Sequence, residues 1–324
     1  KNLGLQFDDY VSYISSLTFI IFSISLSPKV FFIFYQLAKT ADLIHYHFPW
    51  PFMDVLHFLT PVKKPTLVTY HSDIIRQHHL FKLYRPLQKR FFFFFYHIVA
   101  TSPNYLASSN VLASITDKVS VIPLGLNKTL YPAATPEKLA YWQHKLGSKF
   151  FLFIGVLRYY KGLHILIEAA KGIDYPIVIV GAGPIEQALK AQAIKLNVTN
   201  VHFLGYIDDE DKIALLTLCY SMLFPAHLRA EAFGISLLEG CMFGKPMISS
   251  EIGTGTTFIN IHHLTGLVVP PGDSNAFRTA MQYLWNNPDK AKAMGERAEK
   301  RYWSQFTAEQ MALQYVGLYE RLLV

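Results

Sequence analysis

Short, almost wholly apolar runs alternate with helical patterns along this chain, and the alternation limits the folds open to it. In the first half the runs lie at 41–46, 65–70, 97–100 and 118–122, and the longest helical pattern lies at 79–95. The second half repeats the plan with runs at 150–154, 176–180, 200–203, 220–224, 246–249 and 266–269. Apolar strands that alternate with helices indicate parallel sheets covered on both faces. We therefore predict an α/β fold of two doubly wound, Rossmann-like domains that face each other across a cleft.

The segment 123–148 separates the two halves, because it combines three prolines and polar turns with one short helical pattern. The predicted organisation is an N-terminal domain at 1–130, a linker at 131–148, a C-terminal domain at 149–305, and a last helix at 306–324 that packs back toward the N-terminal domain. Ligands of open parallel sheets bind beyond the carboxyl ends of the strands. Functional residues are therefore expected in loops that directly follow strands.

The uncharged stretch 10–27 nearly reaches the length of a membrane span. It contains several serines, and Ser27-Pro28 is typical of a helix N-cap followed by proline in the first turn. These features favour a buried strand around 17–24 and a helix at 28–39 over a membrane span.

Charge is distributed unevenly between the two halves. Residues 1–145 carry 14 lysines and arginines against seven acidic residues, whereas residues 146–324 carry 16 of each. The first half therefore suits an anionic partner such as nucleic acid, an anionic lipid leaflet or a phosphate-bearing substrate. Interleaved aromatic residues favour the membrane surface over nucleic acid. Cys219 and Cys241 both lie in apolar segments, which argues against a disulfide framework and for a reducing compartment.

The segment PAHLRAEAFGISLLEGCMFGKP, which directly follows the strand at 220–224, carries the most informative motif. Glu231 and Glu239 stand eight residues apart, about two helical turns, so both carboxylates can face one ligand at different depths. A carboxylate can accept hydrogen bonds from neighbouring hydroxyls of a sugar or a ribose. A helix start between them would offer free backbone N–H groups to a phosphate, at Phe233, Gly234 and Ile235.

A cationic loop follows the strand at 150–154 in FIGVLRYYKG, where it carries Arg158 and Lys161. Two cations at this place could neutralise a departing diphosphate without a metal ion. The later VGAGP turn at 180–184 lacks the full dinucleotide fingerprint and is weak evidence for NAD.

Histidines mark the strand ends of the first half. His45 and His47 have a spacing that could suggest a metal site, but no acidic or cysteine partner at ligand spacing completes one. Structural or substrate-contacting roles are therefore favoured over metal binding. His71, Ser72 and Asp73 follow another strand and form a plausible polar cluster at the cleft.

With these motifs in this order, the chain resembles the retaining glycosyltransferases of family 4, which have the GT-B fold. The resemblance rests on the E-x7-E segment, the loop at 155–162, the VGAGP turn and the stretch from GTGTTFIN to TGLVVPPGD. The stretches IHYHFPWPFMD, TYHSDIIRQ, LRYYKG and EIGTGT look like the bacterial branch that builds O-antigen or related polysaccharides. That branch contains mannosyl- and rhamnosyltransferases that use GDP sugars.

The resemblance implies a role for each motif residue. Glu231 would hold hydroxyls of the donor sugar, Glu239 would hold the ribose, and His71 would contact the sugar near its sixth carbon. Backbone N–H groups of Phe233, Gly234 and Ile235, with Lys161, would bind the diphosphate, and the base would stack near Tyr206 and Ile207. The implied catalytic residues are Glu231, His71, Lys161 and Arg158, and the donor site would add Gly155 of the cationic loop.

Two features depart from the family pattern. Many members place arginine directly after the first glycine of the cationic loop, whereas this chain has Val156 there and Arg158 two residues later. The family's opening strand and Gly-rich loop are also not found. We therefore expect an N-terminal domain without its first strand, and a chain of low activity.

The predicted function is transfer of a hexose from a nucleotide sugar, GDP-mannose or GDP-rhamnose, to a lipid-linked saccharide acceptor. The resemblance implies no cofactor besides the donor, no metal, no nucleic acid, and a place on the inner face of the cytoplasmic membrane. Two alternatives stay open: a nucleotide-sugar epimerase of the same fold, and a non-catalytic protein that binds sugar nucleotides or lipid.

Overall fold

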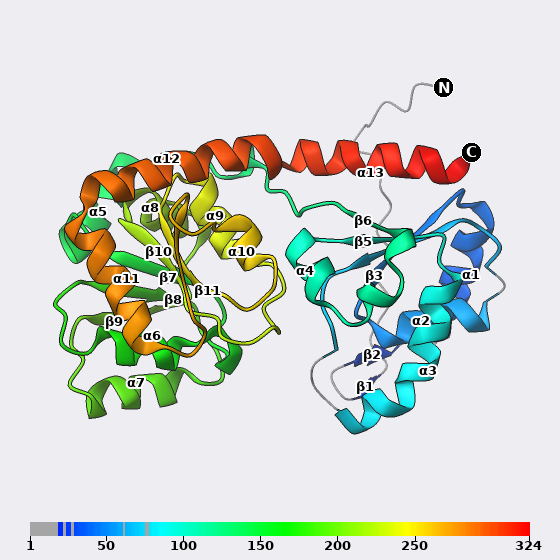
Figure 1. The fold of residues 1–324 in the computed structure, drawn as a ribbon, viewed down its shortest axis with the longest axis horizontal. Coiled ribbons are helices and arrows are strands. Elements are labelled where there is room, and N and C mark those ends of the chain that lie inside the picture. The colour runs from blue at the N-terminus through cyan, green and yellow to red at the C-terminus, as the bar shows by residue number, and fades with distance from the viewer. Residues whose placement is uncertain (1–18, 22–23, 27–28, 61, 75–77) are drawn as a thin grey trace.

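Two parallel sheets with surrounding helices lie side by side in the computed structural model, joined by a linker and a long C-terminal helix (Figure 1). The structure describes residues 19–21, 24–26, 29–60, 62–74 and 78–324. All ten strands predicted from the apolar runs are present in these residues, as a sheet of six strands and a sheet of four.

The six-stranded sheet of the C-terminal half has the order β12-β11-β10-β7-β8-β9 with all neighbours parallel. Its strands are β7 (Phe151–Ile154), β8 (Ile177–Val180), β9 (Val201–Gly205), β10 (Ser221–Phe224), β11 (Met247–Ser250) and β12 (Gly266–Val269). Because the chain winds outward in both directions from the centre, the sheet is doubly wound, with its switch point between β7 and β10. Ligands of such sheets bind at the switch point.

Both faces of this sheet are buried because successive strand side chains point to opposite sides. Phe151 and Phe153 face a core formed with helices α6 (Leu163–Ala170) and α11 (Ser274–Asn286). Leu152 faces the opposite core, formed with α8 (Asp209–Leu218), α9 (Ile235–Met242) and α12 (Pro288–Gln305). The other helices of this half are α5 (Pro136–Leu146), α7 (Glu186–Lys195) and α10 (Thr256–Ile259).

The four-stranded sheet has the order β3-β4-β5-β6 and is also parallel. Its strands are β3 (Ile44–Phe48), β4 (Thr66–Tyr70), β5 (His97–Ala100) and β6 (Val119–Val121). Its strands follow one another in a single direction, so in the described residues this sheet has no switch point. The predicted arrangement of two parallel α/β domains is therefore present, and in the described residues the strands of this smaller sheet are added on one side only. Apolar sequence runs separated by helical patterns predict parallel strand pairing. They do not determine at which edge of the sheet the next strand is added.

Aromatic side chains fill one face of the four-stranded sheet. Tyr46, Phe48 and Tyr70 pack there against α2 (Pro51–Leu59), α3 (His78–Phe94) and α4 (Pro103–Ser108). The opposite face is covered by the C-terminal helix α13 (Ala308–Leu323), whose Leu318 packs against Leu67 and Val99.

A single strand was predicted around 17–24, and for the residues of this segment that the structure describes the prediction was wrong. Strands β1 (Phe19–Ile21) and β2 (Ile24–Leu26) instead form an antiparallel hairpin in which Phe19 pairs with Leu26. From the sequence alone, a continuous apolar run does not distinguish one buried strand from two short strands that pair with each other. The predicted helix at 28–39 corresponds to α1 (Lys29–Thr40).

The uncharged stretch 10–27 lies mostly outside the described residues. Among the helices that are described, none combines the length and the apolar character needed to cross a bilayer.

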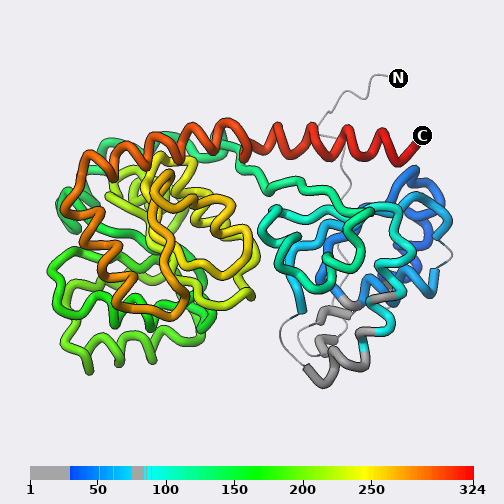
Figure 2. The backbone as a smooth tube through the Cα atoms, in the orientation of Figure 1, coloured from blue at the N-terminus to red at the C-terminus, as the bar shows by residue number. Residues whose placement is uncertain are grey.

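Two segments cross between the sheets and are bonded to each other. The backbone N–H of Leu126 donates to Phe306 at 3.0 Å, and the N–H of Ala308 donates back to Leu126 at 3.0 Å. Gly125 lies so close to Thr307 that a Cβ atom would stand 2.4 Å from its carbonyl oxygen. The linker and the start of α13 therefore run together between the two halves (Figure 2).

Candidate active site

A buried ion pair joins the two loops that leave the switch point of the six-stranded sheet. The Lys161 ammonium, in the loop after β7, contacts the Glu231 carboxylate, in the loop after β10. The loops pack closely because Gly162 has a left-handed φ of 72° and no side chain. A Cβ atom at Gly162 would stand 1.9 Å from the carbonyl oxygen of Pro225. The fold thus brings together the cation and the carboxylate predicted from separate motifs.

Neither partner of this pair is open to solvent, since the side chains of Lys161 and Glu231 are only 14% and 11% exposed. The Lys161 ammonium also lies 5.2 Å from the centre of the Phe224 ring. Gly155, as predicted, lies beside it: a Cβ atom there would stand 4.0 Å from Cε of Lys161. Each partner of such a buried pair can instead bind a ligand: the ammonium can bind a group of opposite charge, and the carboxylate can accept hydrogen bonds from hydroxyl groups.

Helix α9 begins at Ile235, four residues after Glu231. Its N-cap is Gly234, which has a left-handed φ of 97° and no side chain that could accept the first backbone N–H groups. Phe233 is buried, whereas Ile235 is exposed. Free N–H groups and the helix dipole make such a helix start attractive to a phosphate.

Glu239 is buried on α9 but has other partners than Glu231. It accepts a hydrogen bond of 2.8 Å from the Tyr131 hydroxyl, and the Lys212 ammonium lies 3.3 Å away. Burial works to lower the pKa of Lys212, but the carboxylates of Glu239 and Asp209 outweigh it, so this pKa is raised. Burial first, and then Glu239, raise the pKa of Tyr131. Tyr131 and Lys212 were not found from the sequence, since no local motif marks them.

The remaining predicted donor residues lie at the rim. Tyr206 is 86% exposed and, with Ile207, lines a hollow of about 740 Å³ between α5 and α8. Arg158 is also exposed, and it makes no ion pair or side-chain hydrogen bond with the residues that the structure describes. The structure therefore does not bring Arg158 to the pair of Lys161 and Glu231.

His71 follows β4 and lies in a column of three histidines. Its Nε2 is 2.9 Å from Nδ1 of His47, and the two rings stack with centres 5.2 Å apart. Burial, and then the neighbouring His47, lower the pKa of His71 to about 4. Burial, followed by His47 and His71, lowers the pKa of His45 to about 3. All three are therefore suited to neutral hydrogen bonding near pH 7. In the described part of the chain, no group of three or more histidine, cysteine, aspartate or glutamate side chains is arranged so that it could hold a metal ion.

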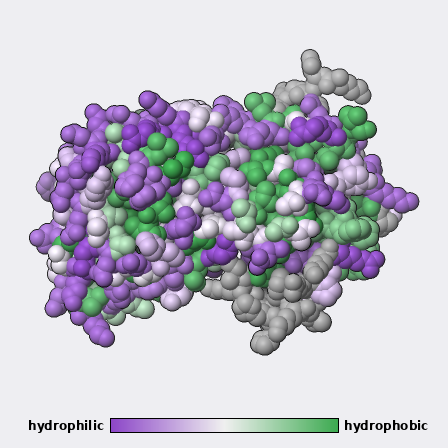
Figure 3. Space-filling model, in the orientation of Figure 1, coloured by the Kyte–Doolittle hydropathy of each residue, from purple (hydrophilic) through white to green (hydrophobic). Residues whose placement is uncertain are grey.

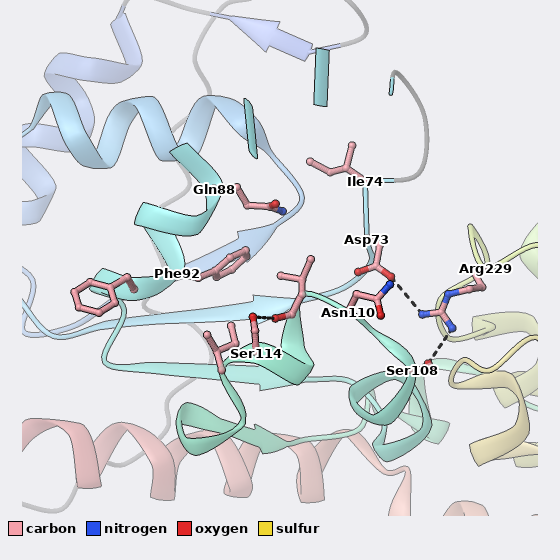
Figure 4. A pocket seen from close by; sticks show the side chains of 11 residues that line it. Asp73, Ile74, Gln88, Phe92, Ser108, Asn110, Ser114 and Arg229 are labelled. Carbon is pink, nitrogen blue, oxygen red and sulfur yellow. Dashed lines mark hydrogen bonds and ion pairs between the residues drawn. The ribbon is translucent and has the colours of Figure 1, made fainter. Parts of the chain in front are cut away.

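An ion pair that the motifs did not reveal connects the two domains. Arg229, two residues before Glu231, lies 3.3 Å from the carboxylate of Asp73, two residues after His71. Its guanidinium also donates to the Ser108 hydroxyl and the Gly253 carbonyl, each at 2.9 Å. Figure 4 shows Arg229 reaching from the C-terminal domain toward Asp73 and Ser108. These contacts place the loop of His71 and the loop of Glu231 on the same cleft.

A cavity of about 590 Å³ adjoins this ion pair on the side of the N-terminal domain. Its wall is mostly apolar and includes Phe92 and Val111, with Asn110 near Asp73 (Figure 4). Gln88 lines the same cavity, and its side-chain nitrogen has no hydrogen-bond partner among the residues that the structure describes.

The doubly wound sheet, with a cationic loop and a paired carboxylate at its switch point, is typical of glycosyltransferases, and comparison with known proteins bears this class out. Residues 135–301 match the family model of glycosyl transferases group 1, and residues 5–130 match that of glycosyltransferase family 4. The chain belongs to the family 4 glycosyltransferases.

Its relatives belong to the branch that the motifs predict. The chain is 58% identical over 304 residues to the D-rhamnosyltransferase WbpZ of Pseudomonas aeruginosa, covering 94% of this chain and 80% of the relative. It is 47% identical over 319 residues to the O-antigen chain mannosyltransferase C of Escherichia coli, covering 98% and 86%. The predicted resemblance to the bacterial O-antigen branch is thereby confirmed.

Solved structures confirm the GT-B fold. The Anabaena protein HepE in complex with UDP superposes with a TM-score of 0.77 at 19% identity, covering 90% of this chain and 82% of that one. The sucrose-phosphate synthase of Thermosynechococcus elongatus also has a TM-score of 0.77, at 23% identity, covering 94% and 82%.

Proposed function

We propose that this glycosyltransferase moves mannose or rhamnose from a GDP sugar to a lipid-linked saccharide in O-antigen synthesis. The observation that carries the proposal is the buried pair of Lys161 and Glu231 beside the uncapped start of α9. A nucleotide sugar supplies both complements, since its diphosphate suits the cations and its sugar hydroxyls suit the carboxylate. The names of the rhamnosyl- and mannosyltransferase relatives support the choice of sugar.

The proposed reaction retains the configuration of the donor sugar. The bond between the anomeric carbon and the diphosphate oxygen breaks, and the acceptor hydroxyl attacks from the same face. The acceptor proton passes to the leaving diphosphate oxygen. Lys161 and the N–H groups at the start of α9 stabilise the charge that develops on the diphosphate, so the reaction needs no metal ion. Glu231, released from Lys161, holds the sugar hydroxyls.

The hollow beside Tyr206 supports guanine as the base. Its rim carries the carboxylate of Glu210, and Asp208 lines the same hollow. Guanine presents neighbouring N–H donors on one edge, and a carboxylate accepts both. The exposed ring of Tyr206 would stack on the base.

An exposed aromatic patch on the N-terminal domain suits the membrane surface. It consists of Leu59, Phe93, Phe94 and Tyr96, which are 69%, 74%, 50% and 61% exposed. Cations flank it, since Arg90 lies 5.7 Å from the Phe94 ring centre and Lys118 lies 5.5 Å from that of Phe93. In Figure 3 hydrophobic residues gather on the N-terminal half of the visible face, whereas the other half is mostly hydrophilic. Aromatic rings with lysine and arginine fit an anionic leaflet, here the inner face of the cytoplasmic membrane.

Donor binding can be tested by protection against thermal unfolding, since only a ligand of the folded state raises Tm. GDP-mannose or GDP-rhamnose should raise Tm, and UDP-glucose and UDP-N-acetylglucosamine should not.

Glu231→Gln should lower sugar transfer by roughly a hundredfold or more, because the sugar loses its carboxylate partner. Glu186→Gln, which loses an ion pair with Lys190 on the surface of α7, is the matched control and should transfer normally. Protection by UDP sugars alone would refute the GDP assignment, and normal transfer by Glu231→Gln would refute its role.

Membrane docking can be tested by flotation with vesicles of anionic or zwitterionic lipid. The protein should float with anionic vesicles, and Phe93→Ser should reduce the bound fraction severalfold because it removes an exposed aromatic ring. Leu313→Ser, at a position on α13 that is 65% exposed, is the control and should bind normally. Equal binding of the wild type and Phe93→Ser would exclude the patch as the docking surface.

A further inference from the structure

Two tyrosines of α13 enter the polar interior of the N-terminal domain. The Tyr319 hydroxyl lies 2.7 Å from Nδ1 of His45. Nε2 of His45 lies 2.7 Å from the Thr69 hydroxyl, which in turn lies 2.7 Å from the Tyr315 hydroxyl. Hydrophobic packing alone does not require these groups, because Leu318, Met311 and Leu322 already join α13 to the sheet.

Both ring nitrogens of His45 are therefore occupied. A neutral imidazole has one N–H donor and one acceptor, and a hydroxyl can complement either. Burial, and then the two neighbouring histidines, lower the pKa of His45 to about 3, so the ring stays neutral at physiological pH. The Tyr319 and Thr69 hydroxyls thus hold the plane of this ring in place.

The His45 ring supports the next histidine by stacking. Its centre lies 4.6 Å from that of His47, with 26° between the planes. His47 stacks on His71 with 13° between the planes, and Nδ1 of His47 lies 2.9 Å from Nε2 of His71. Nε2 of His71 is thereby engaged, and its Nδ1 makes no hydrogen bond with the residues that the structure describes. Nδ1 is thus the nitrogen of His71 that is left for a ligand.

We propose that the hydroxyls of Tyr315 and Tyr319 are positioning groups for His71, acting through Thr69, His45 and His47. The C-terminal helix, through this chain of contacts, fixes the plane in which the His71 ring meets the sugar. The inference rests on the proposed function insofar as His71 contacts substrate. Its structural part, the link between Tyr319 and the His71 imidazole, stands apart from the reaction.

The test compares Tyr319→Phe and Tyr315→Phe, which remove one hydroxyl each and keep the ring. Their control is Tyr283→Phe on α11, where the ring packs near His263 but the hydroxyl makes no hydrogen bond with described residues. We expect kcat for sugar transfer to fall roughly tenfold in Tyr319→Phe. Donor protection in thermal unfolding should be unchanged, since the residues that bind the diphosphate lie in the other domain. Tyr283→Phe should match the wild type in both measurements.

The second measurement is the 15N NMR spectrum of the His71 imidazole, assigned with His71→Asn. Tyr319→Phe should shift the 15N resonances of His71, because the stacked rings of His45 and His47 lose their fixed planes, whereas Tyr283→Phe should leave these resonances unchanged. A variant with normal kcat and unchanged His71 nitrogens overturns the proposal. If the wild type binds no GDP sugar and transfers none, the proposed function fails, and the NMR result alone decides whether α13 positions His71.

Discussion

The residues that carry the chemistry are charged or polar groups whose partners come from distant parts of the chain. Lys161 and Glu231 neutralise each other where a donor would bind, so the site keeps two charges buried without a ligand. Under the proposed function, a nucleotide sugar that enters separates them and replaces one ion pair by a diphosphate bound to the cation and hydroxyls bound to the carboxylate. The free energy needed to separate the pair then lowers the affinity for the donor.

Residue-scale electrostatics also predict how stability depends on pH. The ordinary pKa of histidine is 6.5, but in the folded chain the pKa of His45 is lowered to about 3. Burial is the larger cause, and the neighbouring His47 and His71 add to it. Between these values the unfolded chain binds more protons, so the free energy of unfolding falls as pH falls below 6.5. His45→Gln should remove this contribution, which amounts to at most about 2 kcal/mol between pH 7 and pH 5.

Urea unfolding at pH 7 and pH 5 checks the effect. His202→Gln, at an exposed position of β9, should keep the pH dependence of the wild type. Burial raises the pKa of Asp54 to about 7 and so works in the opposite direction, but it does so in every variant and cancels in the comparison. Identical pH dependence in His45→Gln and the wild type would contradict the assignment.

At the scale of elements, the strands were predictable because each is a short apolar run between helical patterns. Every residue of strands β8 and β10 is buried. A strand that is buried on both faces has a continuous apolar sequence, whereas a strand with one exposed face alternates apolar and polar residues. The hairpin of β1 and β2 was not predictable, since its split depends on pairing and not on composition. The loops that contain Gly155 and Gly234 were recognised because each directly follows an apolar strand and carries charged residues of a motif.

The candidate site was only partly predictable for a related reason. Lys161 and Glu231 were found because each belongs to a local motif next to a strand. Tyr131 beside Glu239, and the tyrosines of α13 beside His45, come from segments with no motif of their own. Their roles depend on which side chains of α13 and the linker reach His45 and Glu239, and no local pattern encodes those contacts.

Gly162 gives a test at this scale, because it sets the distance between the loops of Lys161 and Glu231. Gly162→Ala requires a left-handed alanine and a Cβ atom against the carbonyl of Pro225. We expect a loss of more than about 2 kcal/mol in the free energy of unfolding and a loss of donor protection. Gly172 also has a left-handed φ, of 76°, but nothing lies within 4 Å of its Cβ position. Gly172→Ala should therefore cost only about 1 kcal/mol and leave donor protection intact; equal effects of the two variants on donor protection would contradict the argument.

At the scale of the whole molecule, the two domains are joined by a crossing pair of segments and by one cluster of contacts across the cleft. The crossing pair binds Leu126 to Phe306 and Ala308 through the backbone, so it ties the domains together at one side. The cluster around Arg229 lies on the cleft itself, with Asp73 and Ser108 on one side and Gly253 on the other. Closure of the cleft therefore depends on a few polar contacts in place of a large apolar interface, which is typical of domains that move.

Removal of Arg229 should shift the molecule toward open forms. In Arg229→Ala the Asp73 carboxylate keeps its hydrogen bonds from Tyr70 and Ser109, so the N-terminal domain itself should remain intact. The radius of gyration from small-angle X-ray scattering should rise, and the KM for the donor should rise severalfold, because the closed form is populated less. Arg278→Ala is the matched control, since Arg278 donates to two backbone carbonyls within the C-terminal domain and to nothing across the cleft. A radius of gyration and KM equal to those of Arg278→Ala would show that the cleft stays closed without Arg229, through contacts such as those of Asn104 with Thr257 and of Ser108 with Gly253.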